Sequence, residues 1–182
     1  IARQCARSFR VFERSMAIHM GRGLVTIFNG EGHGKSSAAL GRAVLAAASG
    51  ERVFIIRFLK GKELANPAFF NRLEPEIKIF CFEKSVGSFA ELSDQQKADE
   101  IANIRNGLNF AKKVIATCEC DLLILDEILG LIDNDIISVE DLRNILMARD
   151  EDMSIILTGI HLDDRIAALA GEVSRLEGVK MK

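Results

Sequence analysis

The sequence feature that most constrains the fold is a glycine-rich run, NGEGHGKSS, at residues 29–37. It follows a short β-branched run at 24–28 and precedes an alanine-rich helical pattern at 35–49. Glycines can take dihedrals that turn consecutive backbone N–H groups inward around a phosphate, and the start of a helix adds partial positive charge. This order of strand, loop and helix predicts a phosphate-binding P-loop, in a variant form because the strict pattern has glycine where Asn29 stands.

Each part of this loop has a predicted role in binding Mg-ATP. We expect Lys35 to reach the outer phosphates and the hydroxyl of Ser36 to ligate magnesium. A glycine-rich turn with an accidental Lys-Ser pair is the alternative, which the flanking strand and helix disfavour. The predicted nucleotide-binding residues of the loop are Asn29, Gly30, Glu31, Gly32, His33, Gly34, Lys35, Ser36 and Ser37.

A second polar group follows the apolar run LLIL at residues 122–125. Asp126 and Glu127 come directly after it, at the carboxyl edge of the expected sheet, where ligands of open α/β folds bind. Either carboxylate is a candidate magnesium ligand. Arg57 and Lys60 close another strand at the same edge, as ligand-binding cations or as an ordinary solvated turn. Thr158 ends a further strand there and is interpreted as a plain strand terminator.

Alternating β-branched and helical patterns predict a single α/β domain. The expected fold is P-loop NTPase-like (RecA-like), with a mostly parallel sheet and helices on both faces. Capping boxes predict helices that begin at Ser93 and Ser138. We expect the domain to span residues 21–182, with the arginine-rich residues 1–20 as an N-terminal arm or leader outside it. The expected strands are 24–28, 52–58, 77–82, 122–125, 154–158 and 173–176.

Composition narrows the classes of partner. A formal net charge of −2 over 182 residues gives no general attraction to nucleic acid or to an acidic membrane, and no apolar run reaches transmembrane length. Partners of neither kind are expected. The four cysteines lack the spacing of a zinc site, which predicts reduced thiols in the cytoplasm. The residues alone therefore predict Mg-ATP binding, and they leave the reaction open.

These motifs, in this order, resemble the P-loop-type ATP:cob(I)alamin (corrinoid) adenosyltransferase family. The run NGEGHGKSSAA at 29–39 resembles the family's TGxGKGKTTAA, and RFLKG at 57–61 resembles QFxKG. LDEI at 125–128 matches the family's LDE followed by leucine or isoleucine. LTG at 157–159 and VSRL at 173–176 resemble the later ITG and VSEL. The resemblance covers about residues 21–180.

The resemblance implies a transferase that moves the 5′-deoxyadenosyl group of ATP to the cobalt of cob(I)alamin or another reduced corrinoid and releases triphosphate. Cobalt is itself the nucleophile, so no protein nucleophile is needed. By analogy, Lys35 and Ser36 serve the triphosphate, Asp126 or Glu127 serves the metal, and Lys35 and Glu127 are the catalytic candidates. Phe89 is a candidate for helping cobalamin lose its lower axial ligand, or a loop residue packed on the core. The family also implies a homodimer and a flavoprotein reductase as partner.

Two departures from the family pattern keep other functions open. His33 stands where the family has lysine, so we expect ATP affinity to rise on acidification through the histidine range. Arg57 replaces a glutamine, which partly restores the lost charge. The family's tail beyond the VK at 179–180 has no counterpart in this sequence. The alternatives are a P-loop kinase or ATPase acting at the γ-phosphate, and a non-catalytic relative that binds nucleotide or corrinoid.

Overall fold

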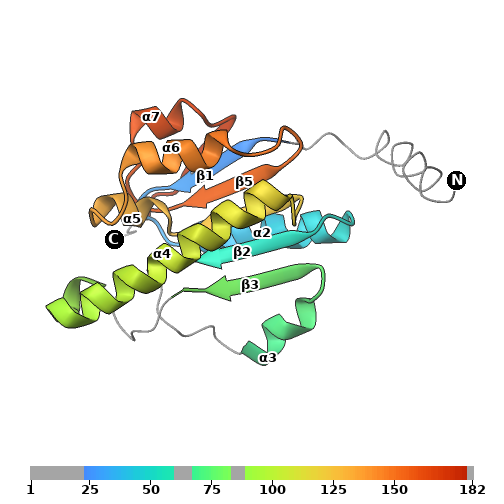
Figure 1. Cartoon of the computed structure of the whole chain (residues 1–182). Coiled ribbons are helices and arrows are strands. Elements are labelled where there is room, and N and C mark those ends of the chain that lie inside the picture. Colours follow the sequence, from blue (N-terminus) through green and yellow to red (C-terminus); the bar gives the residue numbers. More distant parts are fainter. Residues whose placement is uncertain (1–22, 60–66, 83–88, 180–182) are drawn as a thin grey trace, which may run out of the picture.

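Six parallel strands form the sheet that carries the P-loop (Figure 1). The computed structural model describes residues 23–59, 67–82 and 89–179, so the arm at 1–20 and Lys60 lie outside the described residues. The strand order is β3-β2-β4-β5-β1-β6, and each neighbouring pair is parallel. The strands are β1 Val25–Asn29, β2 Val53–Arg57, β3 Ile77–Cys81, β4 Leu122–Asp126, β5 Ser154–Thr158 and β6 Glu172–Arg175. The expected α/β fold is confirmed, and the ends of five predicted strands shift by one residue.

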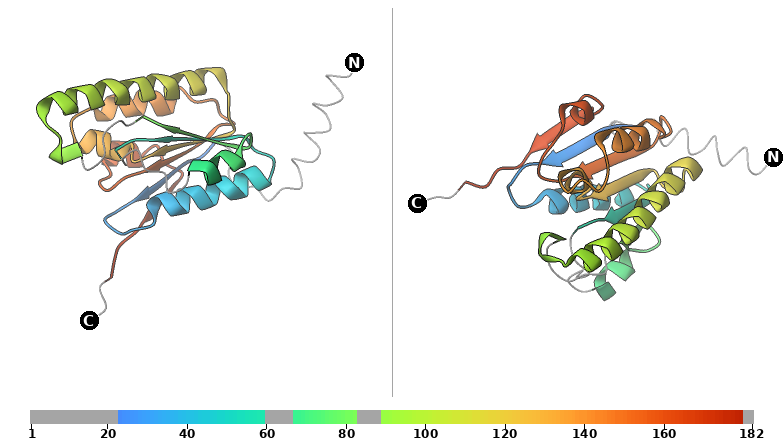
Figure 2. Two further views of the ribbon diagram at one scale, coloured as in Figure 1. Left: turned by 90° about the horizontal axis from the view of Figure 1, so that it is seen from below. Right: turned by 60° about the vertical axis from the view of Figure 1, so that its left-hand side comes forward.

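Helices cover both faces of the sheet, as expected (Figure 2). Helices α4 and α6 lie on one face, and α2 and α3 lie on the other. The helical segments are α2 Lys35–Ala48, α3 Pro67–Phe70, α4 Asp94–Thr117, α5 Leu129–Asp133, α6 Val139–Met147 and α7 Asp164–Ala167, with 3-10 turns at Asn71–Leu73 and Phe89–Glu91. No helix in the described part of the chain is long and apolar enough to cross a membrane.

Both predicted capping boxes are present and fix where α4 and α6 begin. The hydroxyl of Ser93 accepts a hydrogen bond from the amide of Gln96, whose side chain accepts one from the amide of Ser93. Ser138 and Asp141 form the same reciprocal pair at α6. These bonds satisfy amides that the first turn of a helix leaves without intrahelical partners. Local sequence is therefore sufficient to start both helices.

Two apolar clusters fill the space on the two sides of the sheet. Along β4, Leu123 and Leu125 join the cluster beneath α4 and α6, whereas Leu122 and Ile124 join the smaller cluster beneath α2. Successive side chains of a strand point to opposite faces, so this alternation assigns the next residue, Asp126, to the α2 face. The sheet thus places its first carboxylate on the side where the helix of the P-loop lies.

Candidate functional site

The P-loop joins β1 to α2 and has the backbone that its glycines predict. Gly30 and Gly34 take φ values of 111° and 103°, in a region that L side chains rarely adopt. The Nζ atom of Lys35 donates to the carbonyl oxygens of Gly30 at 2.6 Å and Gly32 at 2.9 Å. The lysine ammonium therefore lies against the loop at the start of the helix, where a phosphate would be recognised.

Neighbouring segments hold the loop in place through backbone hydrogen bonds. The amide of Gly30 donates to the carbonyl of Ile160 at 3.0 Å, and the amide of Gly32 donates to that of Leu176 at 2.9 Å. The amide of Leu176 in turn donates to the carbonyl of Asn29 at 2.7 Å. These two glycine amides anchor the loop to its neighbours. The amides of the first turn of α2 lack intrahelical partners and are available to an anion.

Three polar residues form a row across the ends of adjacent strands on the α2 face. Arg57 of β2 lies opposite Asp126 of β4 in the register of the sheet. Leu157 of β5 lies opposite Leu125 of β4, so the next residues of the two strands, Thr158 and Asp126, are also neighbours. The Nε atom of Arg57 lies 3.6 Å from Oδ2 of Asp126. Asp126 is 3% exposed and Thr158 is fully buried. The row thus places a shielded carboxylate between a cation and a hydroxyl.

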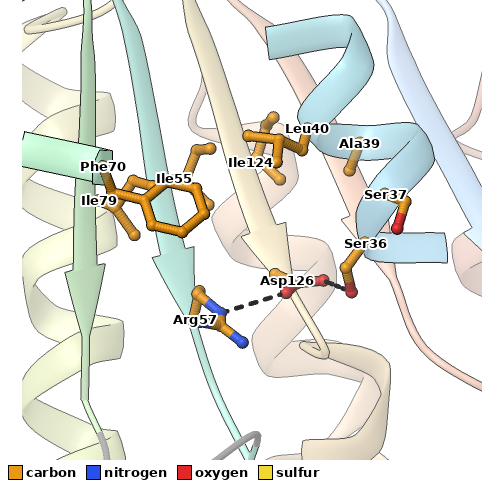
Figure 3. Close-up of a pocket in the computed structure, with 10 residues that line it drawn as sticks. All are labelled: Ser36, Ser37, Ala39, Leu40, Ile55, Arg57, Phe70, Ile79, Ile124 and Asp126. Carbon is orange, nitrogen blue, oxygen red and sulfur yellow. Dashed lines mark hydrogen bonds and ion pairs between the residues drawn. The ribbon is translucent and has the colours of Figure 1, made fainter. Parts of the chain in front are cut away.

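Ser36, in the first turn of α2, completes this arrangement (Figure 3). Its hydroxyl donates to Oδ1 of Asp126 at 2.8 Å. The same oxygen accepts a hydrogen bond from the hydroxyl of Thr158 at 2.6 Å. The structure therefore brings together two of the three residues that the sequence predicted as magnesium ligands, although 90 positions separate them in the chain.

The donor chemistry of this pair fits magnesium bound together with a nucleotide. A hydroxyl and a carboxylate are hard oxygen donors, and Mg²⁺ is held in proteins by one or two such groups plus water and phosphate oxygens. Within the described ranges, no group of three or more His, Cys, Asp or Glu side chains could hold a metal ion by itself. The Ser36–Asp126 pair alone leaves most of the coordination shell of Mg²⁺ to water and phosphate oxygens.

A cavity of about 290 Å³ adjoins Ser36 and Asp126 on the α2 face. Its inner wall is apolar, and its polar residues gather at the end nearest the P-loop (Figure 3). Ligand pockets usually measure about 300–1,000 Å³, so this cavity is large enough to hold part of a nucleotide. Its lining residues are Ser36, Ser37, Ala39, Leu40, Ile55, Arg57, Phe70, Ile79, Ile124 and Asp126.

Other predicted site residues lie around this centre. Glu127 adopts a left-handed backbone conformation with φ of 64°. Its amide donates a hydrogen bond to the hydroxyl of Thr158 at 2.8 Å, and its carboxylate lies beside Gly130. Phe89 is partly buried, packs on the main core and does not line the cavity. Asn29 buries a side-chain oxygen that has no hydrogen-bond partner within the described residues. The loop side chains of Glu31 and His33 are exposed.

Thr158 is the site residue that the sequence interpretation missed. It was expected to be a plain strand terminator, and it bonds instead to both Asp126 and the amide of Glu127. A signal was available: in β2, β4 and β5 alike, the last residue breaks an apolar run with a polar side chain. Parallel strands in register bring such end residues to one edge of the sheet.

Comparison with known proteins identifies the family. Residues 21–182 match the family described as ATP:corrinoid adenosyltransferase BtuR/CobO/CobP. The chain belongs to this family. The corrinoid adenosyltransferases of Escherichia coli (strain K12) and Salmonella typhimurium (strain LT2) are each 30% identical to it over 159 residues, which cover 87% of this chain and 79% of each relative.

Solved structures show the fold of this adenosyltransferase family member at lower identity. The flagellar accessory protein FlaH from Methanocaldococcus jannaschii has a TM-score of 0.59 and 19% identity, over 88% of this chain and 74% of that one. The KaiC-like protein PH0186 from Pyrococcus horikoshii OT3 has a TM-score of 0.56 and 19% identity, over 88% of this chain and 76% of that one. The P-loop NTPase-like fold is thereby confirmed.

Family membership also confirms the resemblance recognised in the sequence motifs. It supports a transferase whose function is ATP-dependent adenosyl transfer to a corrinoid, with ATP and corrinoid as the substrates. The roles of individual site residues are developed below as proposals.

Proposed function

We propose that this chain transfers the 5′-deoxyadenosyl group of Mg-ATP to the cobalt of a reduced corrinoid such as cob(I)alamin. The bond between C5′ and its oxygen breaks and triphosphate leaves with the bonding electrons, while the electron pair of cobalt forms the new bond to C5′. The observation that carries the proposal is the Ser36–Asp126 pair, 2.8 Å apart beside the lysine of a P-loop. A site for triphosphate and metal is what a triphosphate leaving group requires.

The residues of the site divide this task among them. Lys35 and the first turn of α2 bind the triphosphate, and Ser36 and Asp126 hold magnesium. Magnesium, when bound, neutralises charge on the departing triphosphate. Arg57, which is mostly shielded from solvent beside Asp126, adds a second cation at the same edge. Glu127, which directly follows Asp126, is a further candidate for metal binding or catalysis.

The cavity beside Ser36 and Asp126 is assigned to the nucleotide, because its polar residues are those that would hold the triphosphate and its metal. Phe89 and Lys60 stay candidates for contacts with the substrates. We further propose that residues 21–182 form the catalytic domain and residues 1–20 an arm or leader. By analogy with the family, we also propose that the protein is cytoplasmic and forms a homodimer. A flavoprotein reductase would supply the reduced corrinoid.

An anaerobic assay with chemically reduced cob(I)alamin tests the function. Light-sensitive adenosylcobalamin and an equal amount of triphosphate are expected from the wild-type protein with Mg-ATP. Lys35→Ala should abolish both products, because it removes the cation that lies against the loop. Lys113→Ala, at an exposed position on α4, is the matched control that retains activity.

The products also separate this proposal from its alternatives. Inorganic phosphate or ADP in place of triphosphate would indicate a kinase or ATPase acting at the γ-phosphate. Tight ATP binding without turnover on fully reduced corrinoid would indicate a non-catalytic binding protein. Either result would overturn the proposed reaction.

A further inference from the structure

Strand β5 separates the strand that carries the P-loop from the strand that carries Asp126. The sheet order β4-β5-β1 puts the end of β5 between the two halves of the magnesium site. Thr158 is the last residue of β5 and is fully buried. Its hydroxyl can therefore form a hydrogen bond with Asp126 that is shielded from solvent.

One hydroxyl of Thr158 makes two hydrogen bonds with different consequences. It donates to Oδ1 of Asp126 at 2.6 Å, which fixes the rotation of that carboxylate. It accepts from the amide of Glu127 at 2.8 Å, which fixes the backbone directly after β4. Because a hydroxyl has one proton to donate and two lone pairs, both bonds can exist at once.

The bond to Glu127 supports an unusual backbone conformation. Glu127 has φ of 64°, a left-handed value that a non-glycine residue keeps only when its surroundings impose it. Removal of the Thr158 hydroxyl would leave the Glu127 amide without this acceptor, and Asp126 would lose one of two hydroxyl donors to Oδ1. Both acidic residues of the site would then be less constrained.

We propose that Thr158 is a positioning residue for the magnesium site: it orients the Asp126 carboxylate toward Ser36 and holds Glu127 in its left-handed conformation. The inference rests on the proposed function, since it assumes that Ser36 and Asp126 bind the magnesium of Mg-ATP. Partners that orient a metal ligand affect metal affinity by about 10–100-fold. The effect should therefore appear as a changed requirement for magnesium.

Two substitutions at Thr158 separate the effect of the hydroxyl from that of the shape of the side chain. Thr158→Val keeps the shape and removes both hydrogen bonds, whereas Thr158→Ser keeps the hydroxyl and removes a methyl group. Thr26→Val is the matched control, since Thr26 is a buried threonine of β1 whose register partner in β5 is Ile156, away from the carboxyl edge. If Thr158→Val does not fold, Thr158→Ala removes the same hydroxyl and leaves room for the strand to relax.

Calorimetric titration of each folded variant with ATP, at a series of Mg²⁺ concentrations, gives a readout that does not depend on turnover. Thr158→Val should need about 10–100-fold more Mg²⁺ than the wild type for the same ATP affinity. Thr158→Ser and Thr26→Val should match the wild type, and ATP binding without Mg²⁺ should be equal in all of them. A merely structural role would lower thermal stability without this selective effect on magnesium.

The possible failures are distinguishable. Equal Mg²⁺ requirements in Thr158→Val and Thr26→Val would overturn the role of Thr158 and leave the proposed function standing. An equal loss in Thr158→Ser and Thr158→Val would also overturn it, because the hydroxyl would then be irrelevant. A wild-type protein whose ATP affinity does not respond to Mg²⁺ would overturn the proposed function, and this inference with it.

Discussion

Substitution of Gly32 by alanine tests how closely the P-loop depends on the segment after β6. Gly32 does not take a left-handed φ, so a side chain at this position is disfavoured by lack of space and not by backbone strain. A Cβ atom at this position would lie 2.8 Å from three backbone atoms of Leu176 and Glu177. That distance is 0.6 Å short of the 3.4 Å at which ordinary contact begins, and backbone cannot rotate away as a side chain can. The two segments must therefore move apart.

The expected cost follows from two terms. Overpacking of a tight contact costs about 1–3 kcal/mol, and loss of the hydrogen bond from Gly32 to Leu176 adds about 0.5–1.5 kcal/mol. We expect the free energy of unfolding to fall by about 2–4 kcal/mol, which lowers Tm by roughly 4–16 °C for a chain of this size. The displaced loop should also bind ATP at least about tenfold more weakly, since errors of about 1 Å in positioning are costly at such sites.

Gly41→Ala is the matched control, because nothing lies within 4 Å of a Cβ atom at this exposed position of α2. Alanine is the better helix former by about 0.8–1 kcal/mol, so this variant should be slightly more stable than the wild type. Thermal melting and ATP titration of both variants measure the effects. If Gly32→Ala melts and binds ATP like Gly41→Ala, the clash and the anchoring role of Leu176 are refuted.

Two further predictions concern single side chains. Burial raises the pKa of the Cys120 thiol to about 12, with the charge of Asp121 as a further cause, so the native thiol stays neutral at pH 8. In a variant with serine at the other three cysteines, iodoacetamide should modify Cys120 at pH 8 only after unfolding in guanidinium; rapid native labelling would contradict this. The pKa of Cys120 in the folded state lies above its ordinary value of 9.0. The contribution of this thiol to the free energy of unfolding is therefore fully present below about pH 9 and is lost as the pH rises toward 12. His33→Lys should bind ATP more tightly than the wild type at pH 8, because it places a permanent cation in the exposed part of the phosphate loop. Equal ATP affinity of the two proteins would argue against a phosphate contact by residue 33.

The sequence predicted the features that depend on a few consecutive residues. The sequence indicated that glycines of the P-loop would take unusual dihedrals, and Gly30 and Gly34 have positive φ values. The capping boxes at Ser93 and Ser138 formed as predicted, because their hydrogen bonds join residues three positions apart. Ser36 and one of the two acids Asp126 and Glu127 were expected at the same site, since a P-loop and an apolar strand that ends in acid share the carboxyl edge of a parallel sheet.

The role of Thr158 was decided only by the tertiary structure. The chain order of the strands says nothing of their order in the sheet, where β5 lies between β1 and β4. That order depends on how two apolar surfaces are buried against α2 on one side and against α4 and α6 on the other, which involves residues from the whole domain. Thr158 and Asp126 are 32 positions apart, so no local pattern joins them. The sequence by itself predicted which groups would bind a phosphate and a metal, whereas the packing of the sheet determined which buried hydroxyl lies beside the carboxylate.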